Sequence, residues 1–388
     1  MQPFLFNTVG RVLCAPGSAL SLADECKRLG VSRLLLVTDP GLVAIGLVQP
    51  AQEAMAKQGI EIVLFDQVRE DPPEETVLAA ADAGRDAGVD GVLAIGGGSS
   101  MDVAKVVAVL LAGEQGLSEM YGVEQVTGGR LPLILVPTTA GTGSEVTPVA
   151  VVTTGETTKA GVSSPVLLPD VAVLDADLTL GLPASVTAMT GVDAMVHAIE
   201  AYTSRHKKNP LSDNLARQAL ELLGRNIRTA VHDGANREAR GHMLLGAMLA
   251  GQAFANAPVA AVHALAYPLG GHYHIPHGLS NSLVLPSVLA FNAPEAAALY
   301  AEIAPIVVGQ PLSGSDADKT EQMIQSLRDL IDEVELPATL AQANVPRADL
   351  EMLAADAMQQ QRLLVNNPRE VNEADALAIY TDAYGASV

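Results

Sequence analysis

Short apolar runs alternate with helical patterns through the first half of this 388-residue chain. Continuous, β-branched apolar runs of the kind found in buried parallel strands occupy 33–39, 60–66, 91–97 and 131–139. Patterns of helical period, rich in Ala, Leu, Glu and Lys, occupy 18–29, 45–58, 74–88 and 99–113. Because strands and helices alternate at this spacing, the first half is predicted to form a doubly wound, Rossmann-like parallel sheet.

The pattern changes around Pro183. Two further β-like runs lie at 146–154 and 171–175, and after them β-branched residues give way to Ala, Leu, Gln and Met. The predicted helices of this half are 184–203, 212–230, 236–256, 259–271, 294–307, 316–334, 347–358 and 373–386. We therefore predict an α/β dinucleotide-binding domain over 1–180 and an all-helical domain over 181–388.

Composition excludes several classes of partner. Acidic residues outnumber basic ones 44 to 23, for a formal net charge of −21. A field of this sign repels phosphate backbones and anionic lipids, so neither a nucleic acid nor a membrane is expected as a partner. The charged share of 17% is below the usual quarter, which favours an oligomer that buries extra surface.

The two cysteines, Cys14 and Cys26, fit no disulfide framework or zinc-ribbon spacing. The first residues have no basic region followed by a long apolar stretch, and no apolar run reaches eighteen residues. These features predict a cytoplasmic protein.

A glycine-rich turn at 94–105, AIGGGSSMDVAK, follows one predicted strand and opens a helix. Glycines allow close backbone approach to a ligand, and the amides at a helix N-terminus favour an anion. The turn therefore suits a pyrophosphate, although it is not the GxGxxG fingerprint. The alternative is an ordinary strand-to-helix turn capped by serine.

A second small-residue loop at 137–147, PTTAGTGSEVT, follows the next predicted strand. Two such loops at the carboxyl ends of strands in one sheet are far more specific than either alone. Asp39 ends another strand, where a carboxylate can accept the adenine-ribose hydroxyls and repel the 2′-phosphate of NADP. An Asx turn before Pro40 is its alternative role.

Candidate metal ligands lie in the second half. Asp193 and His197 are four apart and share one helix face. Four of the eight histidines then fall within 263–277, at His263, His272, His274 and His277, and spacing alone does not choose among them. Imidazoles with one carboxylate suit Fe(II), Zn(II) or a similar divalent ion.

With these segments in view, the chain resembles the iron-containing (group III) alcohol dehydrogenase family, in the branch of lactaldehyde reductases and 1,3-propanediol dehydrogenases. The resemblance runs from the first strand to the last helix. It is carried by four ordered motifs: GGGSSMDVAK (96–105), PTTAGTGSEVT (137–147), TGVDAMVHAIEAY (190–202) and HALAYPLGGHYHIPHG (263–278). It implies an N-terminal nucleotide-binding domain and a C-terminal helical metal-binding domain of dehydroquinate synthase-like architecture.

Residue roles follow from the resemblance by matching position. The implied metal ligands are Asp193, His197, His263 and His277. The implied contacts to NAD are Asp39, Gly97, Gly98, Ser99, Thr138, Thr139, Thr147, Lys159 and Leu178. Phe254, Val149, Val151 and Tyr267 map near the family's substrate pocket.

The chain departs from the family pattern at three places. Tyr267 replaces a histidine near the nicotinamide, so that histidine's role in proton relay does not transfer, and Tyr267 and His274 become the candidates. Asp71 replaces an asparagine that contributes one cofactor contact. His272 and His274 are additions beside the implied ligands.

The resemblance implies an NAD-dependent alcohol dehydrogenase or aldehyde reductase. A small primary or secondary alcohol or diol would exchange hydride with the nicotinamide, assisted by Fe(II) or Zn(II). The alternatives are a glycerol-type polyol dehydrogenase, a maleylacetate-type reductase, a lyase of the dehydroquinate synthase type, and a non-redox metallohydrolase or metal-binding protein.

Overall fold

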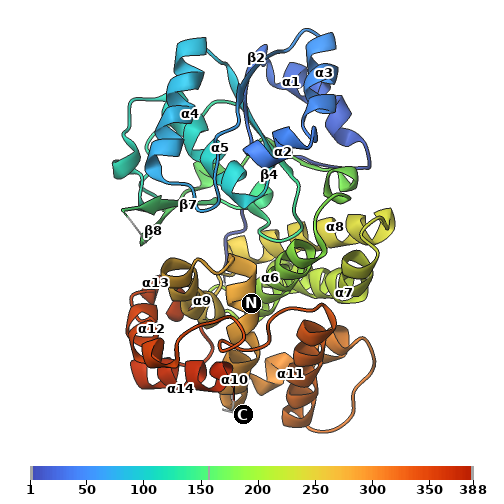
Figure 1. The fold of residues 1–388 in the computed structure, drawn as a ribbon, viewed down its shortest axis with the longest axis vertical. Coiled ribbons are helices and arrows are strands. Elements are labelled where there is room, and N and C mark those ends of the chain that lie inside the picture. Colours follow the sequence, from blue (N-terminus) through green and yellow to red (C-terminus); the bar gives the residue numbers. More distant parts are fainter. Residues whose placement is uncertain (1–2, 156–157, 386–388) are drawn as a thin grey trace. The chain divides into compact units, whose positions relative to one another are not determined.

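The computed structural model describes residues 3–155 and 158–385, which form two compact units (Figure 1). One unit is Asn7–Gly181. The other contains the described residues from Leu182 onward together with the few described residues before Asn7. The chain thus divides after Gly181.

The α/β unit is built on a six-stranded sheet in which every neighbouring pair is parallel. Its strands in spatial order are β1 (Val12–Cys14), β9 (Val171–Leu174), β6 (Leu133–Pro137), β4 (Gly91–Gly96), β2 (Arg33–Val37) and β3 (Glu61–Phe65). A smaller sheet contains β5 (Gly122–Val123), β8 (Thr158–Ser163) and β7 (Val149–Thr154), with β7 and β8 antiparallel. The prediction of a parallel, doubly wound sheet is confirmed.

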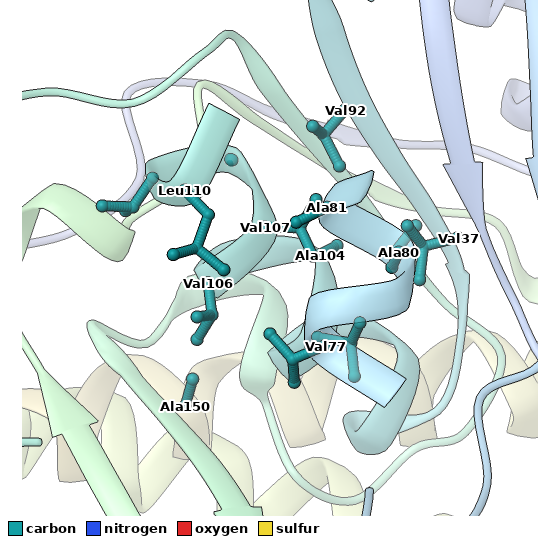
Figure 2. Packing of buried hydrophobic residues seen from close by; sticks show 14 of the residues in the cluster. Val37, Val77, Ala80, Ala81, Val92, Ala104, Val106, Val107, Leu110 and Ala150 are labelled. Carbon is teal, nitrogen blue, oxygen red and sulfur yellow. The ribbon is translucent and has the colours of Figure 1, made fainter. Parts of the chain in front are cut away.

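Helices cover both faces of the large sheet, as its apolar strands require. The helices of this unit are α1 (Leu22–Leu29), α2 (Pro40–Ala44), α3 (Gln49–Lys57), α4 (Glu74–Ala87) and α5 (Gly98–Ala112). Successive strand residues face opposite sides, so Leu35 packs with α4 and α5 while Leu36 packs with α1 and α3. Figure 2 shows the first of these cores, to which Val77 on α4, Val107 on α5 and Val92 on β4 all belong.

The second unit contains helices and connecting loops, with no β-strand among its described residues. Its helices are α6 (Ala184–Thr203), α7 (Pro210–His232), α8 (Arg237–Asn256), α9 (Ala261–Tyr273), α10 (His277–Val308), α11 (Asp316–Glu333), α12 (Leu350–Ala357), α13 (Gln361–Leu364) and α14 (Glu373–Tyr384). Helix α6 packs against α7, α8 and α10, and it is buried continuously from Gly191 to Thr203. Polar side chains along that stretch therefore need partners inside the protein.

Helix α10 differs most from the sequence prediction. It begins at His277 rather than near residue 294, and it continues through Pro286, Pro294 and Pro305. Each proline removes one intrahelical hydrogen bond, which is why the pattern suggested a later start. Packing against α6, α9, α11 and α14 keeps the helix continuous.

Two further features of the elements bear on the sequence interpretation. Helix α10 is long and apolar enough to cross a membrane by composition, but 56% of its most apolar window is buried, as in the core helix of a soluble protein. The predicted helix 45–58 is the shorter α3, which begins at Gln49, and α2 lies before it, outside the predicted range. Strands β1, β5 and β8 were not predicted, because they are short or lack a clear apolar run.

Candidate active site

Helix α6 carries three polar groups on one face inside the helical unit. Asp193, His197 and Glu200 are spaced by four and three residues, so their side chains lie one above another on the helix. All three are buried. Burial of this many polar side chains on one face indicates a site rather than a packing surface.

Helices α9 and α10 bring two histidines to that face. His263 lies in the first turn of α9, and His277 is the first residue of α10. Gly278 explains the close approach of α10 to α6, because a Cβ there would lie 2.4 Å from the Met189 carbonyl oxygen and 3.3 Å from the Asp193 Cβ. Only glycine allows the two helices to meet at this point.

The four side chains converge. Asp193 Oδ1 lies 3.7 Å from His277 Nε2 and 4.0 Å from the Nε2 atoms of His197 and His263. One ligand atom from each of the four residues lies within 4.8 Å of the others. Two atoms that each bind one ion at about 2.1 Å are at most about 4.2 Å apart, so this arrangement fits a divalent cation with little contraction.

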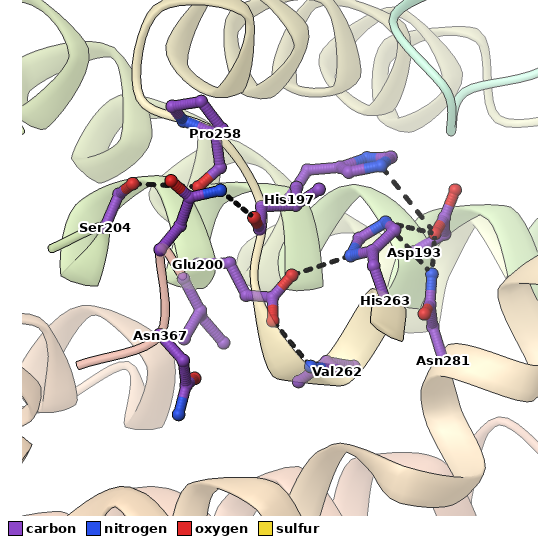
Figure 3. Close-up of polar contacts among 12 residues, drawn as sticks. Asp193, His197, Glu200, Ser204, Pro258, Val262, His263, Asn281 and Asn367 are labelled. Atoms are coloured by element: carbon purple, nitrogen blue, oxygen red, sulfur yellow. Dashed lines mark hydrogen bonds and ion pairs between the residues drawn. The ribbon is translucent and has the colours of Figure 1, made fainter. Parts of the chain in front are cut away.

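Glu200 orients one of these histidines. Its carboxylate accepts hydrogen bonds of 2.7 Å from His263 Nδ1 and from the Val262 backbone N–H (Figure 3). The first bond keeps the proton on Nδ1, which leaves the Nε2 lone pair facing Asp193. The second satisfies an amide in the first turn of α9, where the helix dipole favours a negative charge.

The electrostatics of the cluster favour an ionised aspartate. Burial of Asp193 raises the pKa of its carboxyl. The charges of His197, His277 and His263, together with a hydrogen bond from Asn281, lower this pKa by more than burial raises it. The net pKa of Asp193 is therefore below its ordinary value. An ionised carboxylate beside imidazole lone pairs is the donor set that a divalent metal requires.

Two aromatic side chains border the cluster. Phe254 stacks on the His197 ring at a centroid distance of 4.3 Å, and Tyr267 lies at 5.9 Å from the His277 ring. Both come from helices of the same unit, α8 and α9. They line the ligand set with apolar ring surface.

The remaining histidines are placed elsewhere. His274 is exposed and ends α9 in the left-handed conformation, with φ of 53°. His272 is exposed and contacts Asp356. His242 contacts Asn226, and His232 contacts the Glu333 carbonyl oxygen. None of these residues belongs to the described metal cluster, and a proton-relay role for His274 remains a prediction.

In the α/β unit, the two glycine-rich loops lie side by side. Gly96 at the end of β4 pairs with Pro137 at the end of β6, and the Thr138 N–H donates to the Gly96 carbonyl oxygen at 3.0 Å. A Cβ at Gly98 would lie 2.9 Å from Thr142 Cγ2. Glycine is therefore needed where α5 begins, because the second loop packs directly onto its first turn.

Six of the nine predicted cofactor contacts belong to these two loops. Gly97 is the N-cap of α5, with Gly98 and Ser99 following in its first turn. Thr138, Thr139 and Thr147 belong to the second loop, and Thr139 is 3.8 Å from a Cβ built on Gly97. Leu178 packs partly buried against the core on the opposite face of the sheet.

Asp39 lies at the point where the sheet changes direction. The chain passes from β2 outward to β3 and then returns to β4 on the other side of β2. The carboxyl ends of β2 and β4 flank such a switch point, which is where ligands bind in open α/β sheets. The Asp39 Oδ1 also caps α2, accepting from the Leu42 N–H at 3.0 Å, so the turn-forming role that we considered for Asp39 is present.

A buried lysine that the sequence interpretation left without a role joins the two loops. Lys105 on α5 is 0% exposed, and its Nζ donates to Ser144 Oγ at 2.7 Å, Thr147 Oγ1 at 3.1 Å and the Val149 carbonyl oxygen at 2.7 Å. Burial lowers the pKa of Lys105 despite nearby Asp102 and Glu145. Its position in the GGGSSMDVAK motif was visible, but its burial was not.

Lys159 forms an ion pair with Asp71. The Lys159 Nζ lies 2.5 Å from Asp71 Oδ1, and Asp71 adopts a positive φ of 51°. Thr153 on β7 holds the neighbouring backbone through the carbonyl oxygens of Asp71 and Pro72. The residue that departs from the family pattern therefore contacts the lysine that the resemblance implies as a cofactor contact.

Matches to known proteins extend over nearly the whole chain. Residues 10–176 match the family model for iron-containing alcohol dehydrogenase, and residues 187–384 match the model for the C-terminal part of the same family. The long-chain-alcohol dehydrogenase 1 of Geobacillus thermodenitrificans is 40% identical over 98% of both chains.

Solved structures agree with this assignment. A crystal structure of 1,3-propanediol oxidoreductase superimposes with a TM-score of 0.95 and 35% identity, over 98% of this chain and 100% of that one. The sulfoacetaldehyde reductase of Bifidobacterium kashiwanohense, solved in complex with NAD⁺, superimposes with a TM-score of 0.90 and 28% identity over the full length of both chains. The chain therefore belongs to the iron-containing alcohol dehydrogenase family of NAD-dependent oxidoreductases.

Proposed function

We propose that this protein interconverts a small, uncharged alcohol or diol and its aldehyde or ketone, with NAD as the hydride carrier. The observation that carries the proposal is the convergence of Asp193, His197, His263 and His277. These four residues would hold a divalent metal, Fe(II) first and Zn(II) as the alternative. When bound, such an ion supplies Lewis acidity that lowers the pKa of an alcohol hydroxyl.

The cofactor is proposed to bind at the junction of the two loops. The first turn of α5 would hold the pyrophosphate through Gly97, Gly98 and Ser99. Thr138, Thr139, Thr147, Lys159 and Leu178 would supply the further contacts. The intermediate exposure of Asp39 at the switch point supports a ribose contact and a preference for NAD over NADP.

Phe254 and Tyr267 support a weakly polar substrate. Their rings flank His197 and His277, so a substrate beside the metal would meet aromatic surface. The relatives named above act on chemically different substrates, including a long-chain alcohol and a sulfonated aldehyde. For this chain we favour short alcohols and diols, with Tyr267 and His274 as candidates for the proton path.

A cytoplasmic homodimer is part of the same proposal. Cys14 and Cys26 are both free, which suits a reducing compartment. The low charged share of the sequence supports an oligomer. Light scattering coupled to gel filtration would give the mass of the assembly directly.

The test is NAD reduction by metal-stripped protein, with Fe(II) or Zn(II) added back, across a panel of short alcohols and diols. Activity is expected to return with the metal and to be lost in His263→Ala. His206→Ala, at an exposed position outside the cluster, is the matched control and should retain full activity. NADH binding without metal-dependent turnover on any alcohol would contradict the proposal and favour a related activity on the same fold, such as that of a polyol dehydrogenase.

A further inference from the structure

Asn281 lies among the candidate metal ligands although no motif assigns it a role. It follows His277 by four residues on α10, so both side chains point to the same face of the helix. Asn281 is 0% exposed. In Figure 3 its amide lies beside Asp193 and His263.

Its amide nitrogen contacts three of the four candidate ligands. Asn281 Nδ2 lies 2.6 Å from Asp193 Oδ1, 3.2 Å from His263 Nε2 and 3.3 Å from His277 Nε2. The orientation of the amide follows from these neighbours, because an ionised carboxylate accepts hydrogen bonds and does not donate them. The other end, Asn281 Oδ1, is buried and accepts no hydrogen bond from the part of the chain that the structure describes.

Counting protons shows what the amide does. An NH₂ group has two hydrogens, so it donates to two of the three acceptors at a time. The shortest contact, to Asp193, takes one hydrogen, and His263 and His277 share the other. A single side chain thus draws together lone pairs that would otherwise repel one another.

We propose that Asn281 is a positioning residue, whose amide holds the side chains of the candidate ligands in the arrangement that a metal requires. The Nε2 lone pairs of His263 and His277 are the ones that a metal would need, so they would exchange their contacts with the amide for the metal. Asp193 Oδ1 has more than one lone pair and would keep its bond to Asn281. The amide would then hold the carboxylate in place beside the metal, which is the part that outer partners of metal ligands play.

The inference rests on the proposed ligand set, and its test measures metal binding without NAD or alcohol. Asn281→Leu keeps most of the volume and removes the donors, while Asn281→Ala removes both. Each variant is expected to raise the metal dissociation constant about 10- to 100-fold in competition with a chelator. The visible spectrum of the Co(II)-substituted protein should change in both, because the Asp193 carboxylate is no longer oriented.

Ser282→Ala is the matched control. Ser282 is the next residue on α10, is 1% exposed, and its Oγ has no hydrogen-bond partner among the described residues. The Ser282→Ala variant should bind Co(II) with the spectrum and affinity of the parent.

Wild-type affinity and an unchanged Co(II) spectrum in Asn281→Leu and Asn281→Ala would overturn the inference. If His263→Ala also retained the metal, the proposed ligand set itself would be wrong, so the two failures are distinguishable. Circular dichroism shows which variants fold, and either Asn281 variant alone suffices for the comparison.

Discussion

At the scale of single residues, Asp71 replaces the asparagine of the family pattern and allows a test of the proposed cofactor contacts. Its carboxylate pairs with Lys159 at 2.5 Å. Asparagine tolerates the left-handed conformation of this position as well as aspartate does, so Asp71→Asn removes the charge without straining the backbone. If Lys159 contacts the cofactor, freeing it should strengthen NADH binding. The gain should be at most about fivefold, because exposed ion pairs are worth about 1 kcal/mol or less.

The measurement is the NADH dissociation constant from nucleotide fluorescence. Asp86→Asn removes one negative charge at another exposed position of the same unit and controls for the general electrostatic effect. Lys159→Met should weaken binding. Equal dissociation constants in the parent, Asp71→Asn and Lys159→Met would show that neither residue acts on the cofactor.

Single residues also show where sequence interpretation ends. The clustering of histidines was visible, but the choice of His263 and His277 came from family resemblance, because spacing does not reveal which rings converge. Glu200 and Asn281 follow ligand residues at helical spacing, three after His197 and four after His277, and this spacing was the one available signal for them. Their roles depend on contacts between helices far apart in the chain.

At the scale of elements, the approach of α10 to α6 depends on Gly278. Adding a methyl group there would place it 2.4 Å from a backbone carbonyl oxygen of α6, which neither helix can easily avoid. Gly278→Ala is therefore expected to move the start of α10, and His277 with it. We expect a loss of about 1–3 kcal/mol in the free energy of unfolding, as for other overpacked sites, and weaker metal binding.

Urea unfolding and chelator competition measure the two effects. Gly129→Ala is the control, since a Cβ there would meet no atom within 4 Å and its φ is not positive. Unchanged stability and metal affinity in Gly278→Ala would mean that the helices can separate without disturbing the ligands.

A second prediction at this scale concerns the loop that Lys105 holds. Burial raises the pKa of Glu145 to about 7, against an ordinary value of 4.5, and its own backbone N–H and Lys105 oppose the shift only in part. The folded protein thus favours the protonated carboxyl. The contribution of Glu145 to stability is fully present below about pH 4.5 and is lost as the pH rises to about 7.

Glu145→Gln cannot ionise, so it should avoid this loss. The difference in free energy of unfolding between the variant and the parent should grow from pH 4.5 to pH 7 and then level off, by an amount on the order of 3 kcal/mol. Urea unfolding at pH 5, 6, 7 and 8 tests this, with the exposed Glu351→Gln as control. A difference that does not vary with pH would mean that Glu145 does not titrate in this range.

Elements were easier to predict than their ends. The buried parallel strands and most helices carry strong periodic patterns, and the fold class follows from them. The start of α10 was missed because tertiary packing overrides three prolines. Strand β8 was missed because its sequence, TKAGVS, has little apolar character and is a strand by pairing with β7.

At the scale of the whole molecule, the protein must bind an anionic cofactor while carrying a net charge of −21. Long-range attraction therefore does not favour the cofactor, and local features must do so. The start of α5 supplies oriented amides, and Lys105 lies buried about two turns further along the same helix. Both features lie within the α/β unit.

The proposed contacts to NADH and to the metal belong to different units, and this division leads to a prediction about both ligands. Every proposed cofactor contact lies in Asn7–Gly181, and every proposed metal ligand lies after Leu182. A ligand stabilises the unit that binds it, by about 2.7 kcal/mol at a concentration 100 times its dissociation constant. For units of this size, that corresponds to a rise of roughly 5–10 °C in the unfolding midpoint. In calorimetry, NADH should thus raise the midpoint temperature at which the α/β unit unfolds, and the metal should raise that of the helical unit.

Chelation of the metal should leave the NADH dissociation constant within about twofold of its starting value, because no proposed cofactor contact is a metal ligand. A large loss of NADH affinity on chelation would show instead that the cofactor depends on groups of the helical unit, and the contacts assigned to the two loops would then be incomplete.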